Sequence, residues 1–556
     1  MSPTTTEIGL REVLLALIAE LLGEKALERG GIVLEAPPRA DFGDYSSNAA
    51  LLLAQHAGTA PRALAQRLGE ALAQRLGGQL DHYEIAGPGF LNLFLADQWH
   101  HAALWQVLSE GERFGGGQAS CPERIVVEFV SANPTGPMHV GHARNAAYGD
   151  ALARVLAFHG HTISREFYVN DAGTQIHKLG ASVIALMQGR EVPEDGYHGE
   201  YMHALADSVK AQLADSPQAQ VEPRNVGTVA VSLLLRTMRQ SLDRFGVHFD
   251  HWAYESELHG GHPSAVDQVL GVLEQHGHTY SKDGALWLKT TDFGDDKDRV
   301  LVRSGGEHTY FASDIAYHQD KRERGFDRQI DVWGADHHGY VARMKAAYQA
   351  LGGDSDELEM LTMQLVHLVR SGERAQMSKR AGEFVTLEEL IAEIGVDAAR
   401  WFLLSRSHDT TVDLDLDLAR EQSSDNPVYY VQYAHARIAS VLQKVGSERV
   451  GRALEATPPG RAGAEQPLEA AERALVKKLL AFPAEVGEAA ARRGPHRLTA
   501  YALELAQAFT AFYRDCRVVG AEPATVESTR IALCVACQST IARCLDLLGV
   551  SAPREM

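Results

Sequence analysis

The sequence predicts an α/β protein in which a parallel sheet lies between a small α+β unit and an all-helical bundle. A β-branched strand at 124–130 is followed by a loop, a helix from about 139 past 158, and a second strand at 163–169. This order of strand, helix and strand is typical of a Rossmann-type nucleotide-binding sheet. After about residue 420 the pattern is almost wholly helical, which predicts a bundle.

Three units are expected along the 556 residues, because a domain usually holds roughly 100–200 residues. Residues 1–112 combine helical patterns with an alternating strand, which predicts an N-terminal α+β unit. Residues 120–420 carry the parallel-sheet pattern, and the polar, helical sequence around 180–290 is expected to be an insertion into it. Residues 421–556 form the helical unit.

Composition indicates an ordinary globular protein, with 45% hydrophobic and 23% charged residues. The formal net charge of -20 argues against non-specific binding to nucleic acid, DNA included, but it leaves room for a local basic face. No targeting segment is visible, and the apolar run from Val13 to Ala19 is too short to cross a bilayer. We therefore expect a cytoplasmic protein with no membrane partner.

The five cysteines are too few and too scattered for a disulfide framework, which favours a reducing compartment. Cys534 and Cys537 have the spacing of a metal-binding pair, and Cys544 follows seven residues later. Their segment is apolar and helical and holds no second pair, so thiols packed in a core are favoured over zinc. No structural metal is expected.

The sharpest chemical pattern is His139-Val140-Gly141-His142, at the junction of a strand, a loop and a helix. The first turn of a helix offers backbone N–H groups and the positive end of its dipole to a phosphate, and a glycine lets the nucleotide approach closely. Two imidazoles three residues apart lie on one face and can donate hydrogen bonds to a reacting phosphoryl group. Two exposed histidines on an ordinary helix are the alternative.

A second pattern lies far downstream, at 376–382, and contains Met377, Ser378 and Lys379. A lysine on a glycine-bearing loop can reach a pyrophosphate group and neutralise its charge. A solvated surface loop is the alternative, since most basic segments are of that kind.

Together the two patterns resemble the HIGH and KMSKS signatures of class I aminoacyl-tRNA synthetases, and their order and separation fit. His139 and His142 match the histidines of the first motif, and Met377, Ser378 and Lys379 match the core of the second. Gln376 stands where the family often has lysine.

The resemblance narrows to the arginyl-tRNA synthetases and covers nearly the whole chain. Four segments carry it, at 127–137, 309–317, 333–340 and 426–438. Many arginyl enzymes lack a good KMSKS loop and have a compensating lysine before the HIGH motif. Gly136 stands at that position here, so the sequence resembles the branch that keeps the second loop.

The resemblance implies an enzyme that activates L-arginine with ATP to arginyl-adenylate and pyrophosphate and then transfers arginine to tRNA(Arg). It implies Mg²⁺ bridging the phosphates, bound tRNA as a requirement for activation, and a monomer. The residues implied in catalysis are His139, His142, Met377, Ser378 and Lys379. Those implied in ATP binding are His139, Gly141, His142, Gly334, Asp336, His337 and Lys379. Those implied in arginine binding are Glu128, Ser131, Asn133, His139, Tyr310 and Asp314.

Arginine must be distinguished from lysine, and a carboxylate aligned with the planar guanidinium does this because the pair is bidentate. Asp314, with Tyr310 four residues earlier, is the best candidate for this contact. A helix N-cap and a core aromatic are the alternatives for these two residues.

Contacts to tRNA are expected from both end units, through stacking on or hydrogen bonding to unpaired bases. Packing in a helix core is an equally good interpretation of each aromatic. The candidates are Tyr45, Asn48, Phe90, Asn92, Tyr430, Tyr433, Tyr513 and Met556.

Three other functions compete with this interpretation. Another class I synthetase, such as the cysteinyl enzyme, should have zinc-ligand cysteines near the catalytic fold, where this chain has only Cys121. A small-molecule nucleotidyltransferase would not explain the long helical C-terminal unit. Against a non-catalytic RNA-binding paralogue stand the intact His139, His142 and Lys379.

Overall fold

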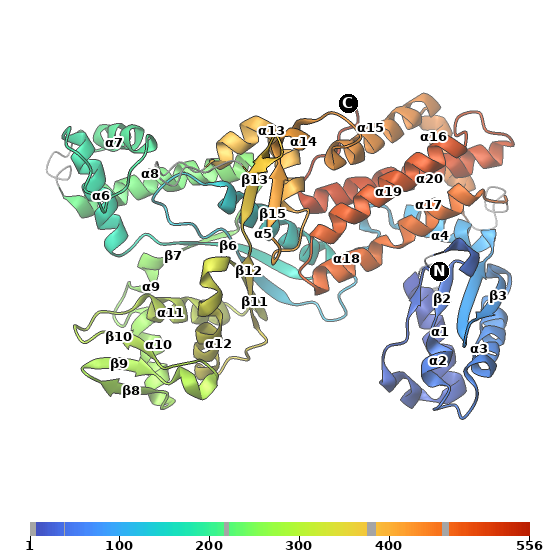
Figure 1. Ribbon diagram of the computed structural model, residues 1–556, viewed down its shortest axis with the longest axis horizontal. Coiled ribbons are helices and arrows are strands. Elements are labelled where there is room, and N and C mark those ends of the chain that lie inside the picture. The colour runs from blue at the N-terminus through green and yellow to red at the C-terminus, as the bar shows by residue number, and fades with distance from the viewer. Residues whose placement is uncertain (1–6, 38, 216–221, 375–384, 459–465) are drawn as a thin grey trace.

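The chain forms an elongated molecule with the parallel sheet near its middle (Figure 1). The C-terminal helices extend to one side of the sheet, and the N-terminal domain hangs from them; two smaller lobes lie on the other side. The computed structural model describes residues 7–37, 39–215, 222–374, 385–458 and 466–556.

The central sheet has five strands, all parallel, in the order β12-β11-β5-β6-β7. The strands are β5 (Arg124–Glu128), β6 (Thr162–Val169), β7 (His251–Tyr254), β11 (Arg328–Gly334) and β12 (Leu358–Met363). Parallel strands need long crossover connections, which here are mostly helices. The predicted α/β fold with a Rossmann-type sheet is thereby confirmed.

Helix α5 (Val140–His159) connects β5 to β6 and is buried along most of its length. Gly149 allows it to press onto the sheet, since a Cβ at this position would lie only 2.1 Å from the ring of Phe129. A side chain here would push α5 off the strand that leads to the site. The glycine therefore sets how closely the helix and the sheet approach.

The expected insertion at 180–290 needs a correction, because β7 lies inside this range and pairs with β6. The segment leaves the sheet as three helices, returns for one strand and leaves again. The first excursion holds α6 (Thr174–Met187), α7 (Tyr201–Gln212) and α8 (Pro223–Arg244). The second holds α9 (Glu255–Leu258), α10 (Ala265–Gln275), β8 (Thr279–Lys282), β9 (Ala285–Leu288), η7 (Thr290–Phe293) and β10 (Arg299–Val302). At four residues, β7 is too short to separate from its helical surroundings by pattern alone.

The second excursion closes with a small antiparallel sheet, β10-β9-β8, and α11 (Tyr310–Glu323) returns the chain to β11. Between β11 and β12 lie η8 (Ala335–Tyr340) and α12 (Val341–Ala350). A third sheet, β14-β13-β15, follows the central one. Its strands and helices are β13 (Val366–Arg370), β14 (Glu373–Arg374), α13 (Leu387–Leu403), β15 (Val412–Asp415) and α14 (Leu416–Arg420).

The N-terminal domain is the predicted α+β unit, with helices packed on an antiparallel sheet of order β1-β2-β4-β3. Helix α4 then runs from this domain against α17 and α20 of the C-terminal bundle. The strands are β1 (Leu34–Glu35), β2 (Tyr45–Ser47), β3 (Leu80–Ala86) and β4 (Phe90–Leu95). The helices are α1 (Glu7–Leu22), α2 (Ala49–Leu53), α3 (Pro61–Leu76) and α4 (Asp97–Glu110), with short 3₁₀ turns η2 (Glu24–Arg29), η3 (Ala40–Phe42), η4 (Gly77–Gln79) and η5 (Gly111–Arg113).

The C-terminal domain is a helix bundle, as predicted. Its helices are α15 (Pro427–Val445), α16 (Ser447–Ala456), α17 (Ala470–Leu480), α18 (Phe482–Ala491), α19 (His496–Asp515) and α20 (Ala524–Leu548). By length and composition α20 could cross a membrane, but 67% of its most apolar window is buried within the protein, which identifies it as a core helix. Cys534, Cys537 and Cys544 are buried on it, in agreement with the packing interpretation.

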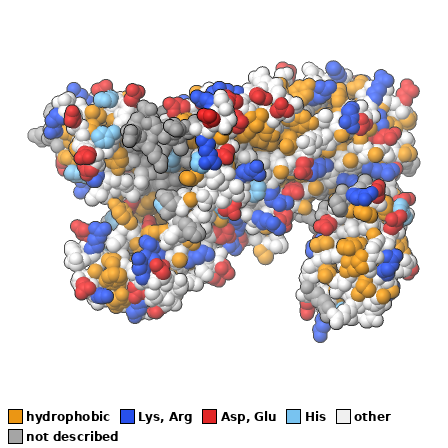
Figure 2. Space-filling model, in the orientation of Figure 1, with side chains coloured by type: hydrophobic (Ala, Val, Ile, Leu, Met, Phe, Trp, Pro, Cys, Tyr) orange, Lys and Arg blue, Asp and Glu red, His pale blue; other side chains and the backbone are white. Residues whose placement is uncertain are grey.

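Positive and negative side chains are interspersed over the face drawn in Figure 2, so the net charge of -20 is not gathered in one region of that face.

Ion pairs join the N-terminal domain to the bundle. Asp97 lies 2.7 Å from Arg473, and Asp44 lies 3.1 Å from Lys477. The two end units are thus joined by ion pairs from α17 to the start of α4 and to Asp44, directly before β2.

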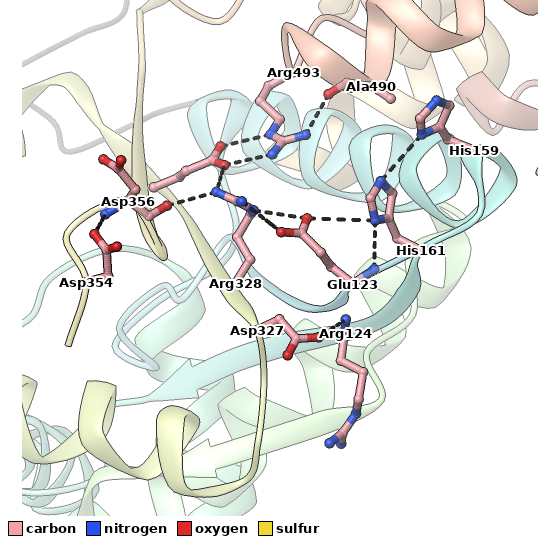
Figure 3. A network of polar contacts seen from close by, with 11 residues as sticks. Glu123, Arg124, His159, His161, Asp327, Arg328, Asp354, Asp356, Ala490 and Arg493 are labelled. Carbon is pink, nitrogen blue, oxygen red and sulfur yellow. Dashed lines mark hydrogen bonds and ion pairs between the residues drawn. The ribbon is translucent and has the colours of Figure 1, made fainter. Parts of the chain in front are cut away.

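A polar network joins the bundle to the amino ends of the sheet strands (Figure 3). Arg493, directly after α18, donates two hydrogen bonds to Glu359 of β12, at 2.8 and 2.7 Å. Glu359 also accepts from Arg328 of β11, and Arg328 lies 2.8 Å from Glu123 beside β5. Since such bidentate pairs are directional, they set the angle between bundle and sheet.

We expect Arg493→Met to lower the thermal unfolding midpoint by a few degrees, because two charge-assisted hydrogen bonds to a half-buried carboxylate are lost, worth about 1–3 kcal/mol. The control is Arg492→Met, whose guanidinium is 71% exposed and pairs with Glu488 within one helix turn. Differential scanning calorimetry measures both variants. Equal midpoints for the two would contradict the role given to the network.

Candidate functional site

A cavity of about 520 Å³ opens at the carboxyl ends of the parallel strands. Glu128 at the end of β5, Tyr168 near the end of β6 and Glu255 directly after β7 all line it, as does the end of β11 at Val332 to Gly334. Open parallel sheets bind their ligands at this edge. The location and the size both suit a small organic substrate.

Two carboxylates with tyrosine partners face one another across this cavity. Asp314, on α11, accepts a hydrogen bond of 2.5 Å from the Tyr340 hydroxyl. Glu255, on α9, is held in the same way by the hydroxyl of Tyr168. Asp171 accepts hydrogen bonds from the backbone N–H (2.9 Å) and hydroxyl (2.7 Å) of Ser256 and so fixes the start of α9. Both carboxylates are therefore preorganised.

Burial and mutual repulsion make this pair of carboxylates hard to ionise. Burial raises the pKa of Glu255 to about 7, and the charge of Asp314 adds to the shift. Burial also raises the pKa of Asp314, although Tyr340 opposes it. A cation bound between the two carboxylates would relieve their repulsion. A planar guanidinium could also donate hydrogen bonds from its N–H groups to both of them.

Glu128 lines the cavity as predicted, but its charge is paired within the protein. Its Oε2 lies 2.6 Å from Nζ of Lys321, which is buried and also lies 2.8 Å from Asp331. Its Oε1 accepts a 2.7 Å hydrogen bond from Ser131. Glu128 therefore lines the cavity with its charge paired, and Glu255 is a further carboxylate of the same lining.

The turn after β5 places Ser131 at the cavity wall through an uncommon backbone. Val130 and Ser131 have φ values of 68° and 38°, a region that a β-branched residue rarely enters. Asn145 of α5 stabilises the turn, accepting from the Val130 N–H at 2.7 Å and donating to the Val332 carbonyl at 2.9 Å. One helix side chain thus ties the ends of β5 and β11 together.

The two predicted histidines begin α5 and stack on each other. Their ring centroids are 3.7 Å apart with an interplanar angle of 21°. His139 is the N-cap residue, and its Nδ1 accepts from the Gly141 N–H at 3.1 Å. Nδ1 of His142 accepts from the His139 N–H at 3.3 Å. Because both Nδ1 atoms accept, the ring proton of each imidazole lies on Nε2.

Burial keeps these imidazoles neutral. It lowers the pKa of His142 to about 3, with a further contribution from His139, and it lowers the pKa of His139 as well. Neutral rings that each carry a proton on Nε2 can donate a hydrogen bond to a phosphate oxygen without transferring the proton. The predicted arrangement of two donors on one helix face is present.

The segment that follows residue 384 is attached to the start of α5. The Val140 N–H donates to the Val385 carbonyl at 3.1 Å, and the Leu387 N–H donates to the Met138 carbonyl at 2.8 Å. Met377, Ser378 and Lys379 lie outside the described residues. The chain re-enters the described structure beside His139, which agrees with a joint site for the two motifs.

The structure brings most of the predicted small-molecule residues to one cavity. Its lining includes Glu128, Ser131, Asn133, Tyr310, Asp314, Gly334 and His337. His139, Gly141 and His142 are not part of the lining, so the expected direct contact of His139 with arginine finds no support in the cavity geometry. Asp336 is in η8, and its side chain lies outside what the structure describes.

Sequence reasoning missed Glu255, Tyr168 and His318, which all line the cavity. Tyr168 had a detectable signal, because polar residues at the end of a parallel strand face the ligand edge. Glu255 had none, since the strand before it lies within the range where an insertion is expected. His318 follows Asp314 by one helix turn and shares its face.

The N-terminal tRNA candidates differ in accessibility. Phe90 is 41% exposed, whereas Tyr45 is only 2% exposed and packs against Trp99. Asn92 is buried and accepts from the Ser46 hydroxyl at 2.7 Å. Asn48 bonds the backbone of Val33 and Gly31. Tyr45 and Asn92 are therefore core residues, which corrects their assignment to RNA contact.

The C-terminal candidates form an aromatic surface on α15 and α19. Tyr433 is 42% exposed and stacks with Tyr429 at 6.3 Å. Arg437 covers Tyr513 at 4.7 Å and donates to the Tyr433 hydroxyl at 2.7 Å. Tyr430 is half-buried and donates to Thr510, and Met556 is 54% exposed. Exposed rings beside a guanidinium suit base stacking.

Family models match almost the whole chain. Residues 10–95 match the arginyl tRNA synthetase N terminal domain, and residues 103–438 match the class I (R) tRNA synthetase catalytic domain. Residues 431–556 match the DALR anticodon binding domain.

Relatives of known function are similar over the same length. The arginine–tRNA ligase of Moorella thermoacetica is 46% identical over 532 residues, which are 94% of both chains. That of Bacillus subtilis is 43% identical over 533 residues, again 94% of both chains. The arginyl-tRNA synthetase structure of Thermus thermophilus has a TM-score of 0.75 and 25% identity, covering 97% of this chain and 99% of that chain.

We expect the affinity for L-arginine to fall by about tenfold between pH 8 and pH 6, because a ligand cation needs Glu255 ionised and its pKa is near 7. As the pH falls through this value, the carboxylate takes up a proton and the guanidinium loses a partner. Isothermal titration calorimetry measures the dissociation constant. Glu255→Gln should bind more weakly at pH 8 and lack this acid dependence; an unchanged acid dependence in the variant would refute the assignment.

Proposed function

The chain belongs to the arginyl-tRNA synthetase family and ligates arginine to tRNA, and on this premise we propose how its residues divide the work. Asp314 and Glu255 bind the guanidinium, and Ser131 and Asn133 hold the α-amino and α-carboxylate end. His139 and His142 act on the α-phosphate of ATP. The observation that carries the proposal is the pair of tyrosine-held carboxylates in a cavity at the strand ends.

In the first step, a carboxylate oxygen of arginine attacks the α-phosphorus of ATP. The new bond joins that oxygen to phosphorus, and the bond to the bridging oxygen breaks, so pyrophosphate leaves with the electron pair. His139 and His142 donate from Nε2 to the phosphoryl oxygens as charge builds on them, and the N-terminus of α5 adds its dipole. Lys379 neutralises the leaving pyrophosphate, while Gly334, Asp336 and His337 hold the adenosine.

In the second step, a ribose hydroxyl at the 3′ end of tRNA(Arg) attacks the adenylate carbonyl and AMP leaves. No covalent bond to the protein forms, so catalysis is positioning and charge stabilisation. Tyr433 and Tyr513, with Arg437 between them, stack on bases of the anticodon loop, and Phe90 contacts the tRNA from the N-terminal domain. The exposed ring of Tyr433 and the guanidinium beside it support this role.

Mg²⁺ that arrives with ATP would offset the phosphate charge during the transfer, beside Lys379 and the imidazoles of His139 and His142. Activation of arginine requires bound tRNA. We also propose that the enzyme works as a cytoplasmic monomer and binds neither DNA nor membranes. Light scattering of the purified protein tests the monomer.

We expect ATP–pyrophosphate exchange only with arginine, and only when tRNA is present. The reason is that neither a neutral side chain nor the ammonium of lysine has the several N–H donors in one plane that would hydrogen-bond to both carboxylates. Exchange is measured with each of the twenty amino acids, with and without total tRNA. Exchange with a different amino acid would reject the proposed specificity, and so would the absence of exchange under every condition.

Asp314→Asn should raise the KM for arginine roughly 100-fold or more, because a charged partner of the guanidinium is lost from a buried site. The KM for ATP should stay within about twofold, since the nucleotide is bound at α5 and η8. Aminoacylation kinetics measure both constants.

The matched control for this substitution is Asp320→Asn on the same helix, whose carboxylate pairs with Arg324 and is 45% exposed. This control should leave both KM values unchanged. An equal loss for arginine and ATP in the Asp314 variant would overturn the guanidinium contact.

A further inference from the structure

His318 lies directly behind the carboxylate pocket and makes hydrogen bonds with both ring nitrogens. It is 3% exposed and follows Asp314 by one turn of α11. Its Nδ1 lies 2.7 Å from the Asp314 backbone carbonyl, and its Nε2 lies 2.7 Å from Oδ2 of Asp331. The same side chain also lines the cavity.

Both partners of His318 are acceptors. A carbonyl oxygen cannot donate, so Nδ1 carries a proton. Asp331 also accepts from the Lys321 ammonium at 2.8 Å, and although burial opposes its ionisation, Lys321 and His318 lower its pKa. An ionised Asp331 requires a proton on Nε2 as well. The geometry therefore describes an imidazolium rather than a neutral ring.

We propose that His318 is a positioning residue of the arginine pocket that acts as a buried imidazolium. Its Nδ1–H holds the turn of α11 that carries Asp314, and its charge keeps the Asp314 carboxylate in the ionised form that a guanidinium needs. The inference rests on the proposed role of Asp314 in binding arginine.

The charges behind the pocket balance in pairs. Lys321 and His318 are positive, and Asp331 and Glu128 are negative, all four joined through Lys321 and Asp331. The negative charge that is left at the cavity belongs to Asp314 and to Glu255. Loss of the imidazolium would leave one carboxylate of the buried group without its partner, next to a pocket that is already negative.

The titratable and charged groups that face His318 come from three elements. Asp314, Tyr317 and Lys321 lie on its own helix, Asp331 lies on β11, and Glu128 lies on β5. Burial opposes its charge, but Asp331 outweighs burial and raises the pKa of His318 above its usual value. As the pH rises through that raised pKa, one of the two hydrogen bonds is lost, so arginine affinity should fall on the alkaline side.

The test compares His318→Gln, whose amide can replace Nε2, with His318→Asn, whose amide can replace Nδ1. Neither side chain can carry the charge. The matched control is His276→Gln, an exposed histidine whose Nδ1 also lies 3.1 Å from a backbone carbonyl, that of Ala350. Calorimetry gives the dissociation constants for arginine and for ATP between pH 6 and pH 9.

Both His318 variants should bind arginine about tenfold or more weakly at pH 7.5, with ATP affinity within about twofold of the parent. Towards pH 9, arginine affinity should fall more steeply in the parent and in the His276 control than in either variant. The ionisation of the amino group of arginine affects the parent and every variant equally. It therefore cancels in the ratio of the variant's dissociation constant to the parent's. Parent-like arginine affinity in either variant, or a ratio that does not change with pH, would overturn the proposal.

A second ligand keeps the test decisive if the variants do not fold. 5-Guanidinopentanoate has the guanidinium and carboxylate of arginine but no amino group, and its guanidinium does not titrate below pH 9. Its affinity for the unmodified protein should rise as Glu255 ionises near pH 7 and then fall towards pH 9; the absence of a fall by pH 9 would overturn the imidazolium. Failure of the unmodified protein to bind arginine at all would instead refute the proposed function.

Discussion

The substrate pocket depends on burying two carboxylates between which the described part of the chain places no full positive charge. Asp314 and Glu255 have tyrosine hydroxyls as their nearest partners, and a hydroxyl orients a carboxylate without neutralising it. The folded protein therefore stores an electrostatic cost that a bound guanidinium removes. In the proposed role of Asp314 and Glu255, the selectivity for a flat cation follows from that cost as much as from the contacts themselves.

The cost can be tolerated because the carboxylates just behind the pocket are neutralised. Lys321 lies between Glu128 and Asp331, and all three side chains are buried, so water screens these ion pairs little. Had Glu128 been unpaired, three carboxylates would face one cavity and each would favour protonation. The buried lysine thus limits the negative charge at the cavity to the two groups that a single guanidinium can satisfy.

The order of elements, the strand-helix-strand unit and the paired histidines could be predicted from the sequence, because each is a local pattern. Asp314 could be found only through family resemblance, since four residues of helix do not distinguish a ligand from a cap; the actual cap of α11 is Thr309. Glu255 and Lys321 reach the site through strand order and packing, which no local pattern contains. For Tyr45 the sequence leaves RNA contact and core packing equally open, because burial of an aromatic in a turn-rich segment has no sequence signal.

Helix α5 combines the chemistry with the contacts between domains. Beyond its two histidines, Arg144 donates to backbone carbonyls of the segments at 364–365 and 407–410. Tyr148 donates to the Arg493 carbonyl of the bundle at 2.5 Å. Asp150 pairs with the buried Arg400 of α13, which in turn donates to the Leu548 carbonyl at the end of α20. Because a helix is stiff along its axis, the position of the two imidazoles depends on all of these contacts. The C-terminal bundle therefore helps to position histidines that belong to the domain of the central sheet.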